Sequence, residues 1–397
     1  MKIPDKIISE AWNVIEKATN PFGLMATSTA RDNYARVWSR DSVITGLAGI
    51  YNDHDNTIAA LKKSLINLQK YQSVHGQIPS NITCEENPKV SYGKLTGRID
   101  ATSWWIIGVA SYGLYANDQE FIDQMFPAVE KAFQILEVWE MNGRGLIYTP
   151  LSGNWADEYI SEGYVLYDQL LRIWALRLCA KLYKKNEFDS KAKFYSQLVL
   201  DNFYSNSNAA NYHPDAFEKL KANNDAHLWF SLNANGYDTR FDMAANAIAL
   251  LLQLHPEPER LEKYLLELAT ETGSWMLPVF YPVIKKGDPK WELLSTNYSF
   301  SFKNEPYHFH NGGSWPVFLG MLVLGLKSNG LNNAAENISK ALVESLEAES
   351  NGIFHEYWST DKYRPSGNTN MCFSASGVLL IEGVSNLNQL SLYKYFL

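Results

Sequence analysis

The sequence has 397 residues, of which 46% are hydrophobic, and carries a formal net charge of -8. A chain of this length and apolar content can bury a large core. The negative charge argues against nucleic acids and anionic membrane surfaces as partners, because both require clustered positive charge.

Three cysteines lie far apart in the sequence, and the N-terminal residues are polar. Cys84, Cys179 and Cys372 lack the spacing of a disulfide framework or of a thiolate metal site. The segment from Met1 to Lys6 lacks the apolar core of a secretory signal, and no stretch approaches the roughly 18 continuous apolar residues of a membrane helix. We expect reduced thiols and a soluble, cytoplasmic protein.

Apolar residues recur at helical spacing along most of the chain. The first such segment runs from Lys6 to Ala18, and another runs to Tyr71 from Asn56, which we take as its N-cap. Similar segments cover residues 44–51, 120–138, 163–184, 190–203, 241–254, 258–270, 316–328, 332–347 and 373–381. A short alternating segment near Met276 to Ile284 is the exception. The pattern predicts an all-α chain.

The polar and aromatic motifs lie in the loops between these helices or at the helix starts that follow. This arrangement favours antiparallel helix pairs closed into a ring, an (α/α)6 toroid, whose loops at one end build a central pocket. We expect residues 1–397 to form a single domain of this kind. An open helical repeat array is the alternative, but no fixed sequence period supports it.

The first polar motif runs from Asp32 to Ser42 and contains Tyr34 and the adjacent pair Arg40-Asp41. An Arg and an Asp side by side at a helix start offer donors and acceptors that suit neighbouring hydroxyls of one sugar. A helix cap with a surface ion pair is the alternative. In the second motif, residues 97–107, Asp100 precedes Trp104 on an apolar helix.

The third motif, residues 152–159, places Asp157 and Glu158 directly after Trp155. Desolvation beside the indole is expected to raise the pKa of a carboxyl group and keep it protonated near neutral pH, as a general acid requires. Asp157 is the candidate, and Glu158 is its rival. A solvent-exposed carboxylate at a helix start is the alternative for either residue.

The fourth motif, residues 352–358, contains Glu356-Tyr357 among aromatic residues, with Lys362 and Arg364 close behind. A carboxylate kept ionised in this way can orient and deprotonate a water. One acid and one base flanking a bond are the usual equipment of glycoside hydrolysis, and an inverting pair leaves roughly 6.5 to 9.5 Å for the water.

The loop from Tyr307 to Pro316 contains two glycines, and Pro316 suits the first turn of the apolar helix that follows. His308 and His310 form an H-x-H pair without a third spaced ligand, so we expect polar contacts to substrate or to loop carbonyls rather than a metal site. No glycine-rich phosphate loop follows a strand, so we expect no nucleotide cofactor. The 12 Trp and 23 Tyr residues offer flat apolar faces with a polar handle, which suit sugar rings.

In chain order, these motifs resemble those of the neutral/alkaline invertases, glycoside hydrolase family 100, which is related to the inverting trehalases and α-glucosidases of the same clan. The similarity covers nearly the whole chain, and the string from His310 to Pro316 is its most specific part. The matching residues are Asn33, Tyr34, Val37, Arg40, Asp41, the stretch 98–105, Asp157 with the region up to Gln169, Phe241, Asp242, Asn246, Tyr281, Pro282, the stretch 310–316, Glu356 and Tyr357.

The resemblance implies an (α/α)6 barrel and inverting hydrolysis of sucrose without a cofactor. It makes Asp157 the proton donor to the bridging oxygen and Glu356 the base on water. Together with neighbouring side chains of the same motifs, the expected sugar-binding residues are Tyr34, Arg40, Asp41, Asp100, Trp104, Trp155, Gln169, His310, Asn311, Trp315 and Tyr357.

The chain departs from the family pattern after Asp157. The invertases carry basic residues and a His-Gly-His-Pro string there, whereas this chain has the stretch from Glu158 to Tyr164. Recognition of fructose is therefore open. The alternatives are another α-glucoside (trehalose, a short maltooligosaccharide or a glucosylated small molecule), a sugar 2-epimerase, or a sugar-binding protein without turnover. The expected partner is a small sugar, and the aromatic helices also allow a homo-oligomer.

Overall fold

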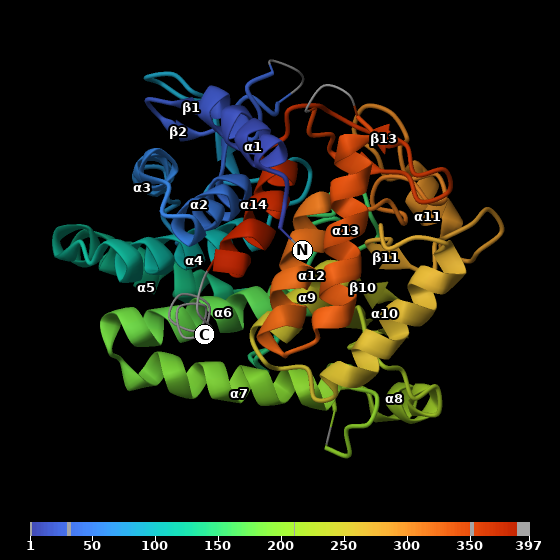
Figure 1. Ribbon diagram of the computed structural model, residues 1–397. Coiled ribbons are helices and arrows are strands. Elements are labelled where there is room, and N and C mark those ends of the chain that lie inside the picture. Colours follow the sequence, from blue (N-terminus) through green and yellow to red (C-terminus); the bar gives the residue numbers. More distant parts are fainter. Residues whose placement is uncertain (1, 30–32, 210, 350–352, 387–397) are drawn as a thin grey trace.

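The computed structural model describes residues 2–29, 33–209, 211–349 and 353–386. Six buried helices contact one another in a closed cycle: α2 with α4, α4 with α6, α6 with α9, α9 with α12, α12 with α14, and α14 with α2 (Figure 1). Their bounds are Ser39–Tyr51 for α2, Asp100–Ala116 for α4, Leu166–Tyr183 for α6, Met243–Leu251 for α9, Pro316–Ser328 for α12 and Cys372–Asn386 for α14. The prediction of a mostly helical chain is confirmed.

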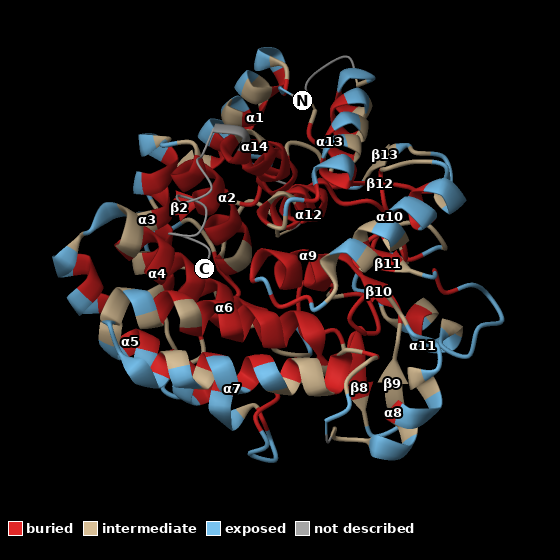
Figure 2. Cartoon of the chain, turned by 60° about the horizontal axis from the view of Figure 1, so that its bottom comes forward, coloured by how far each residue is buried: buried red, intermediate tan, exposed pale blue. Residues whose placement is uncertain are grey.

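A second set of helices lies outside this cycle. The helices α1, α3, α5, α7 and α13 contact α14, α2, α4, α6 and α12 respectively, and α10 contacts α13. In Figure 2 the helices α5, α7 and α13 are exposed on one side and buried on the other, which is the amphipathic pattern that the sequence predicts. Their bounds are Asp5–Ala18 (α1), Asp55–Gln69 (α3), Gln119–Val138 (α5), Asn186–Phe203 (α7), Pro258–Thr272 (α10) and Asn332–Glu347 (α13).

Helices α12 and α14 approach each other closely because glycines face each other across the contact. A Cβ atom added to Gly320 of α12 would collide with the backbone of Gly377, and one added to Gly377 would collide with the backbone of Pro316. The side chains of α12 from Val317 to Leu324 are buried on all sides. A helix that is apolar all round belongs in the interior, and here it lies in the inner cycle.

The described loops pair into short antiparallel strands, so the prediction of an all-α chain is wrong in this respect. The strands are β1 (Thr19–Asn20), β2 (Gly23–Leu24), β3 (Val37–Trp38), β4 (Asn81–Ile82), β5 (Val90–Ser91), β6 (Tyr148–Thr149), β7 (Gly163–Val165), β8 (Ser231–Asn233), β9 (Gly236–Asp238), β10 (Phe241–Asp242), β11 (Phe280–Tyr281), β12 (Tyr357–Trp358) and β13 (Pro365–Ser366). Strands of two or three residues are too short to leave an alternating pattern. Only β11 lies in the segment predicted as a strand, 276–284.

Local capping explains where the helix boundaries differ from those predicted. The helix expected over 241–254 begins at Met243, because the side chain of Asp242 accepts the N–H of Ala245 at 3.1 Å and caps it. Asn56 is not an N-cap, since α3 begins at Asp55. The short helices α8 (Pro214–Lys221) and α11 (Trp291–Thr296) were not predicted.

Across the described ranges, no helix is both long and apolar enough to span a membrane.

Candidate active site

A cavity opens at the end of the helical cycle where α2, α12 and α14 begin. It holds about 750 Å³, its open mouth included. Arg40 and Asp41 come from the first turn of α2, Trp315 directly precedes α12, and Phe373 lies in the first turn of α14. The lining residues are Ala26, Asn33, Tyr34, Trp38, Arg40, Asp41, Lys94, Trp155, Asp157, Glu158, Phe300, Lys303, Phe309, His310, Trp315, Glu356, Met371 and Phe373.

Glu356, which directly precedes β12, is 4% exposed and is held by two hydrogen bonds. Its Oε1 accepts from the Tyr34 hydroxyl at 2.7 Å, and its Oε2 accepts from the backbone N–H of Asn368 at 3.1 Å. Burial raises the pKa of Glu356 above its ordinary value, while these two bonds act in the opposite direction. The carboxylate therefore has a fixed orientation in the cavity wall.

Gly367 makes room for this carboxylate. Its φ of +79° is a left-handed conformation that favours glycine, and a Cβ atom there would collide with the Glu356 carboxyl group. The preceding strand β13 pairs with β12, and the backbone N–H of Glu356 donates to the Asn368 carbonyl at 2.8 Å. The short β12–β13 hairpin thus supports Glu356 from both its backbone and its side chain.

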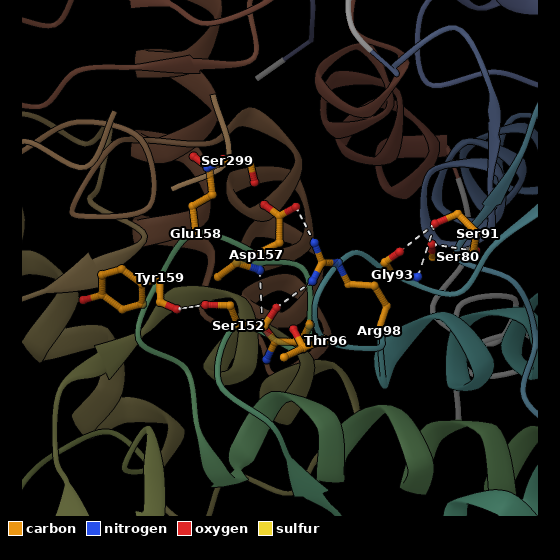
Figure 3. A network of polar contacts seen from close by, with 12 residues as sticks. Ser80, Ser91, Gly93, Thr96, Arg98, Ser152, Asp157, Glu158, Tyr159 and Ser299 are labelled. Atoms are coloured by element: carbon orange, nitrogen blue, oxygen red, sulfur yellow. Dashed lines mark hydrogen bonds and ion pairs between the residues drawn. The ribbon is translucent and has the colours of Figure 1, made fainter. Parts of the chain in front are cut away.

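Asp157 lies in the loop between β6 and β7 and has a different environment. Its side chain is 28% exposed, and its Oδ2 accepts from Arg98 Nη2 at 2.6 Å (Figure 3). The other guanidinium nitrogen of Arg98 donates to the Ser152 carbonyl at 2.7 Å, which fixes the pair to the loop. Burial raises the pKa of Asp157, but the positive charges around it, with that of Arg98 first and those of Lys94 and Arg40 behind it, together outweigh burial, and the net pKa lies below the ordinary value. The prediction of a raised pKa beside Trp155 is therefore wrong for the free site. The ion pair with Arg98 could not be predicted, because no sequence pattern connects the two residues.

Glu158 points into the same cavity and is 3% exposed. Its Oε1 accepts from the backbone N–H of Ser299 at 3.1 Å (Figure 3). Its Oε2 lies 3.8 Å from Lys303 Nζ. The two neighbouring carboxylates therefore belong to different contacts, Asp157 to Arg98 and Glu158 to the loop before α12.

Two carboxylates hold the guanidinium group of Arg40 in place. Its Nη1 donates to Asp100 Oδ2 at 2.8 Å, and Asp41 lies 3.8 Å away. Asp100 is 1% exposed and does not line the cavity, so its role is to orient Arg40. Burial raises the pKa of Asp41, and the charge of Arg40 acts against this shift.

Aromatic rings form one wall of the cavity. The Trp155 ring stacks on Phe280 at 5.7 Å and meets the Trp315 ring edge-on at 5.5 Å. His310 stacks on Trp315 at 5.4 Å, and burial lowers the pKa of His310 to about 3, so this imidazole is neutral near pH 7. Flat faces of this kind suit the C–H faces of a sugar ring.

Several buried polar atoms of the lining residues have no hydrogen-bond partner among the described residues. They are Arg40 Nε, Trp155 Nε1, Glu158 Oε2 and His310 Nδ1. A buried polar group left without a partner costs about 1–3 kcal/mol, so native proteins keep few of them. In the wall of a cavity, such atoms can form hydrogen bonds with the hydroxyl groups of a bound ligand.

A family model described as alkaline and neutral invertase matches residues 182–383, about half of the chain. The chain belongs to the alkaline and neutral invertase family, a family of glycoside hydrolases. A second model, amylo-alpha-1,6-glucosidase, matches residues 14–151. Glu356 lies inside the invertase match, whereas Asp157 lies between the two matched ranges.

Two plant proteins illustrate the relationship within the invertase family. Probable alkaline/neutral invertase A, chloroplastic, of Arabidopsis thaliana is 22% identical over 88% of this chain, which spans 65% of that relative's length. Cytosolic invertase 1 of Oryza sativa subsp. japonica is 23% identical over 80% of this chain and 67% of its own length. The chain thus spans about two thirds of these relatives.

Solved structures share the fold at low sequence identity. The GH63 mannosylglycerate hydrolase of Thermus thermophilus, in complex with Tris and D-glycerate, superposes with a TM-score of 0.65 at 14% identity, over 94% of this chain and 99% of that one. A rhamnosidase from Klebsiella oxytoca with rhamnose bound gives 0.63 at 12% identity, over 96% of this chain and 63% of that one.

The structure brings most of the residues that the invertase motifs single out to the cavity, but five of them have other positions. Trp104 is fully buried and donates to the Tyr167 hydroxyl at 2.9 Å. Tyr357 packs behind Trp315 at 5.8 Å, and Asp100 lies beneath Arg40. None of the three lines the cavity. They support the wall from behind.

Gln169 and Asn311 are the other two, and their amide groups are occupied by the backbone. Gln169 exchanges two hydrogen bonds with Ile147, each of 2.8 Å, and Asn311 does the same with Ile284. A buried amide that mimics a backbone pairing in this way fixes a loop. The prediction that these two side chains contact substrate is not supported by their positions.

The structure also adds lining residues that the invertase motifs did not indicate. Lys94, Phe300, Lys303 and Phe373 reach the cavity from loops or from a helix start. Arg98 lies in a recognised motif, but nothing in its spacing connected it with Asp157. Asp32 and Gly352 of the predicted motifs lie outside the described residues. Within the described ranges, no group of three or more His, Cys, Asp and Glu side chains is placed to hold a metal ion.

Proposed function

We propose that the protein is an inverting glycoside hydrolase that cleaves sucrose, with Asp157 as general acid and Glu356 as general base. The observation that carries this proposal is the position of two carboxylates with unlike environments in one cavity that has an aromatic wall and buried polar atoms free to bind hydroxyls. Membership of the invertase family supports sucrose, because the relatives are named invertases and sucrose is the substrate of an invertase.

The two roles follow from what holds each carboxylate. Glu356 is oriented by Tyr34 and Asn368, which suits a base that must aim a water at the anomeric carbon. Asp157 is partly exposed on the cavity side, which suits an acid that must reach the bridging oxygen. Its low pKa in the free site means that substrate binding has to raise it, and a sugar that excludes solvent from the carboxylate acts in that direction.

We further propose that the two sets of helices form one (α/α)6 toroid, and that the whole chain is a single domain of this kind. The closed cycle of contacts through α2, α4, α6, α9, α12 and α14 supports this, as do the outer helices that pack on it. In such a toroid the N-terminal ends of the inner helices surround the pocket, as those of α2, α12 and α14 do here.

The direct test of the activity is the first sugar released from sucrose, followed by NMR before mutarotation. Attack on the glucosyl carbon with inversion gives β-glucose as the first product. Trehalose and maltose serve as neutral comparison substrates with the same α-glucosyl unit. Release of α-glucose from sucrose would contradict inverting attack on the glucosyl carbon, and no release from any α-glucoside would contradict the hydrolase assignment.

Substrates with different leaving groups test the two carboxylate roles. Fluoride leaves with little protonation, so Asp157→Asn should lose roughly 10²- to 10⁴-fold on sucrose but far less on α-glucosyl fluoride. Glu356→Gln should lose activity on both, because each reaction needs the activated water. Glu158→Gln is the matched control beside the acid. If Glu158→Gln, and not Asp157→Asn, shows the selective loss on sucrose, Glu158 is the acid.

A further inference from the structure

Two lysines line the mouth of the cavity. Phe300 lines the cavity and is 67% exposed, so it marks the mouth, and Lys94 Nζ lies 4.9 Å from the centre of its ring. Lys303 Nζ lies 4.6 Å above the Phe309 ring, deeper in the same wall. Both ammonium groups are therefore held against aromatic faces that a bound ligand would also meet.

Both lysines line the cavity that contains Asp157 and Glu356. Lys303 Nζ is 3.8 Å from the carboxyl group of Glu158, the residue that follows Asp157. Lys94 lines the same cavity, and its positive charge contributes to the lowered pKa of Asp157. A general acid protonates the leaving group, so a cationic side chain near the Asp157–Glu158 pair can contact the leaving group rather than the sugar that carries the anomeric carbon.

The charges of the two lysines are only weakly balanced by the described residues. Lys94 forms no ion pair and no hydrogen bond with them, and the contact of Lys303 with Glu158 is a long one at 3.8 Å. By comparison, Lys62 and Lys191 on the outer helices lie 2.6 and 2.7 Å from their carboxylates. Two ammonium groups without a close carboxylate partner at the mouth of a binding cavity indicate that an anionic group of a ligand binds there.

We propose that Lys94 and Lys303 bind an anionic group, a phosphate or a carboxylate, on the leaving group of the substrate. This inference rests on the proposed function and narrows its range of substrates, because it predicts which of two substrates with the same scissile bond has the higher kcat/KM. Sucrose phosphorylated on its fructosyl unit, or the α-glucoside of a hydroxy acid, is then cleaved with a higher kcat/KM than its neutral counterpart.

Matched pairs of substrates test the proposal on the full chain. One pair is sucrose and sucrose bearing a phosphate on a primary hydroxyl of the fructosyl unit, and the other is the α-glucoside of a hydroxy acid and its uncharged amide. We expect the charged member of at least one pair to be preferred by about tenfold at low salt, with the preference falling as ionic strength rises. The pair that shows it identifies phosphate or carboxylate as the group bound.

In the double variant Lys94→Gln/Lys303→Gln, the ratio of kcat/KM for the charged member to that for the neutral member should fall close to one. The control variant Lys63→Gln, at an exposed position on α3, should keep the ratio of the unaltered protein. Equal kcat/KM values for both members of both pairs in the unaltered protein would overturn the inference and leave the hydrolase assignment intact. A preference that survives in the double variant would overturn it too. If none of the four compounds releases glucose, the proposed function fails, and this inference fails with it.

Discussion

At the scale of single residues, the two carboxylates of the cavity have pKa values shifted in opposite directions. Burial raises the pKa of Glu356, and the positive charges around Asp157, that of Arg98 first, lower the pKa of Asp157 despite burial. In the free protein the proposed base therefore holds its proton more tightly than the proposed acid does. The order has to reverse in the complex, so groups that tune either pKa are as important for turnover as the carboxylates themselves.

Tyr34→Phe tests the group that tunes Glu356. The hydroxyl stabilises the ionised carboxylate, so its loss should raise the pKa of Glu356 further and lower kcat about 10- to 100-fold, the size expected for a hydrogen bond to a charged group. The pKa can be followed in the carboxyl NMR signal that disappears in Glu356→Gln. Tyr204→Phe is the control, because that hydroxyl also donates to a glutamate, Glu257, and neither residue lines the cavity. An unchanged pKa in Tyr34→Phe would contradict the argument.

Asp157→Asn tests the ion pair with Arg98 through stability. A carboxyl group whose pKa is lowered by folding stabilises the folded state above its unfolded pKa and loses that contribution as the pH falls through the folded one. At pH 7 the variant should lose about 1–3 kcal/mol of unfolding free energy, because Arg98 stays buried without its partner. The difference should shrink as the pH falls below 3.8. Urea unfolding at pH 7 and pH 3.5 measures it, and a difference independent of pH would count against the pair.

At the scale of secondary-structure elements, the helices could be predicted from the sequence, but the hydrogen-bond partners of several buried side chains could not. The spacing of apolar residues depends on one helix alone, so α1 and α13 can each be predicted from their own sequence. The amide of Gln169 or Asn311 can bind a sugar hydroxyl or a backbone carbonyl equally well. Only the neighbouring loop, distant in sequence, decides between them. The same holds for Lys94 and Lys303, which belong to no motif.

The β12–β13 hairpin gives a prediction at this scale, through Gly367→Ala. The added methyl group must adopt an unfavourable φ and would also collide with the Glu356 carboxyl group, so both stability and kcat should fall. Gly330→Ala is the matched control, because its φ of +77° is nearly the same but no atom lies within 4 Å of the new Cβ. Both variants should lose roughly 1 kcal/mol of stability from backbone strain. Only Gly367→Ala should lose activity, and equal activities would show that the hairpin does not position the base.

At the scale of the whole molecule, the central question is whether the cycle of helices is closed by real energetic coupling. The contact between α14 and α2 joins segments near opposite ends of the described chain, whereas the other contacts in the cycle join segments closer in sequence. In a closed ring each inner helix has a neighbour on both sides, so no helix can separate without exposing two apolar faces. In an open array the last helix would separate at low cost.

Two asparagines allow the closing contact to be compared with an ordinary one. Asn52 ends α2 and donates to the Leu379 carbonyl of α14 at 2.9 Å, while Asn329 ends α12 and donates to the Leu250 carbonyl of α9 at 2.8 Å. Each also donates to its own helix at 2.8 Å, so the two side chains form the same kind of bridge. They differ in the sequence separation that the bridge spans, 327 residues against 79.

If the ring is closed, Asn52→Ala and Asn329→Ala should lower the free energy of unfolding by similar amounts, each about 0.5–1.5 kcal/mol, because each removes a side-chain hydrogen bond between two inner helices. Urea unfolding followed by tryptophan fluorescence and by far-UV circular dichroism should shift equally in both variants, with an unchanged slope. A negligible effect of Asn52→Ala beside a clear effect of Asn329→Ala would show that α14 separates from α2 without unfolding the rest. Arg40 on α2 and Phe373 on α14 would then not be held in one cavity by the fold, and substrate would have to bring them together.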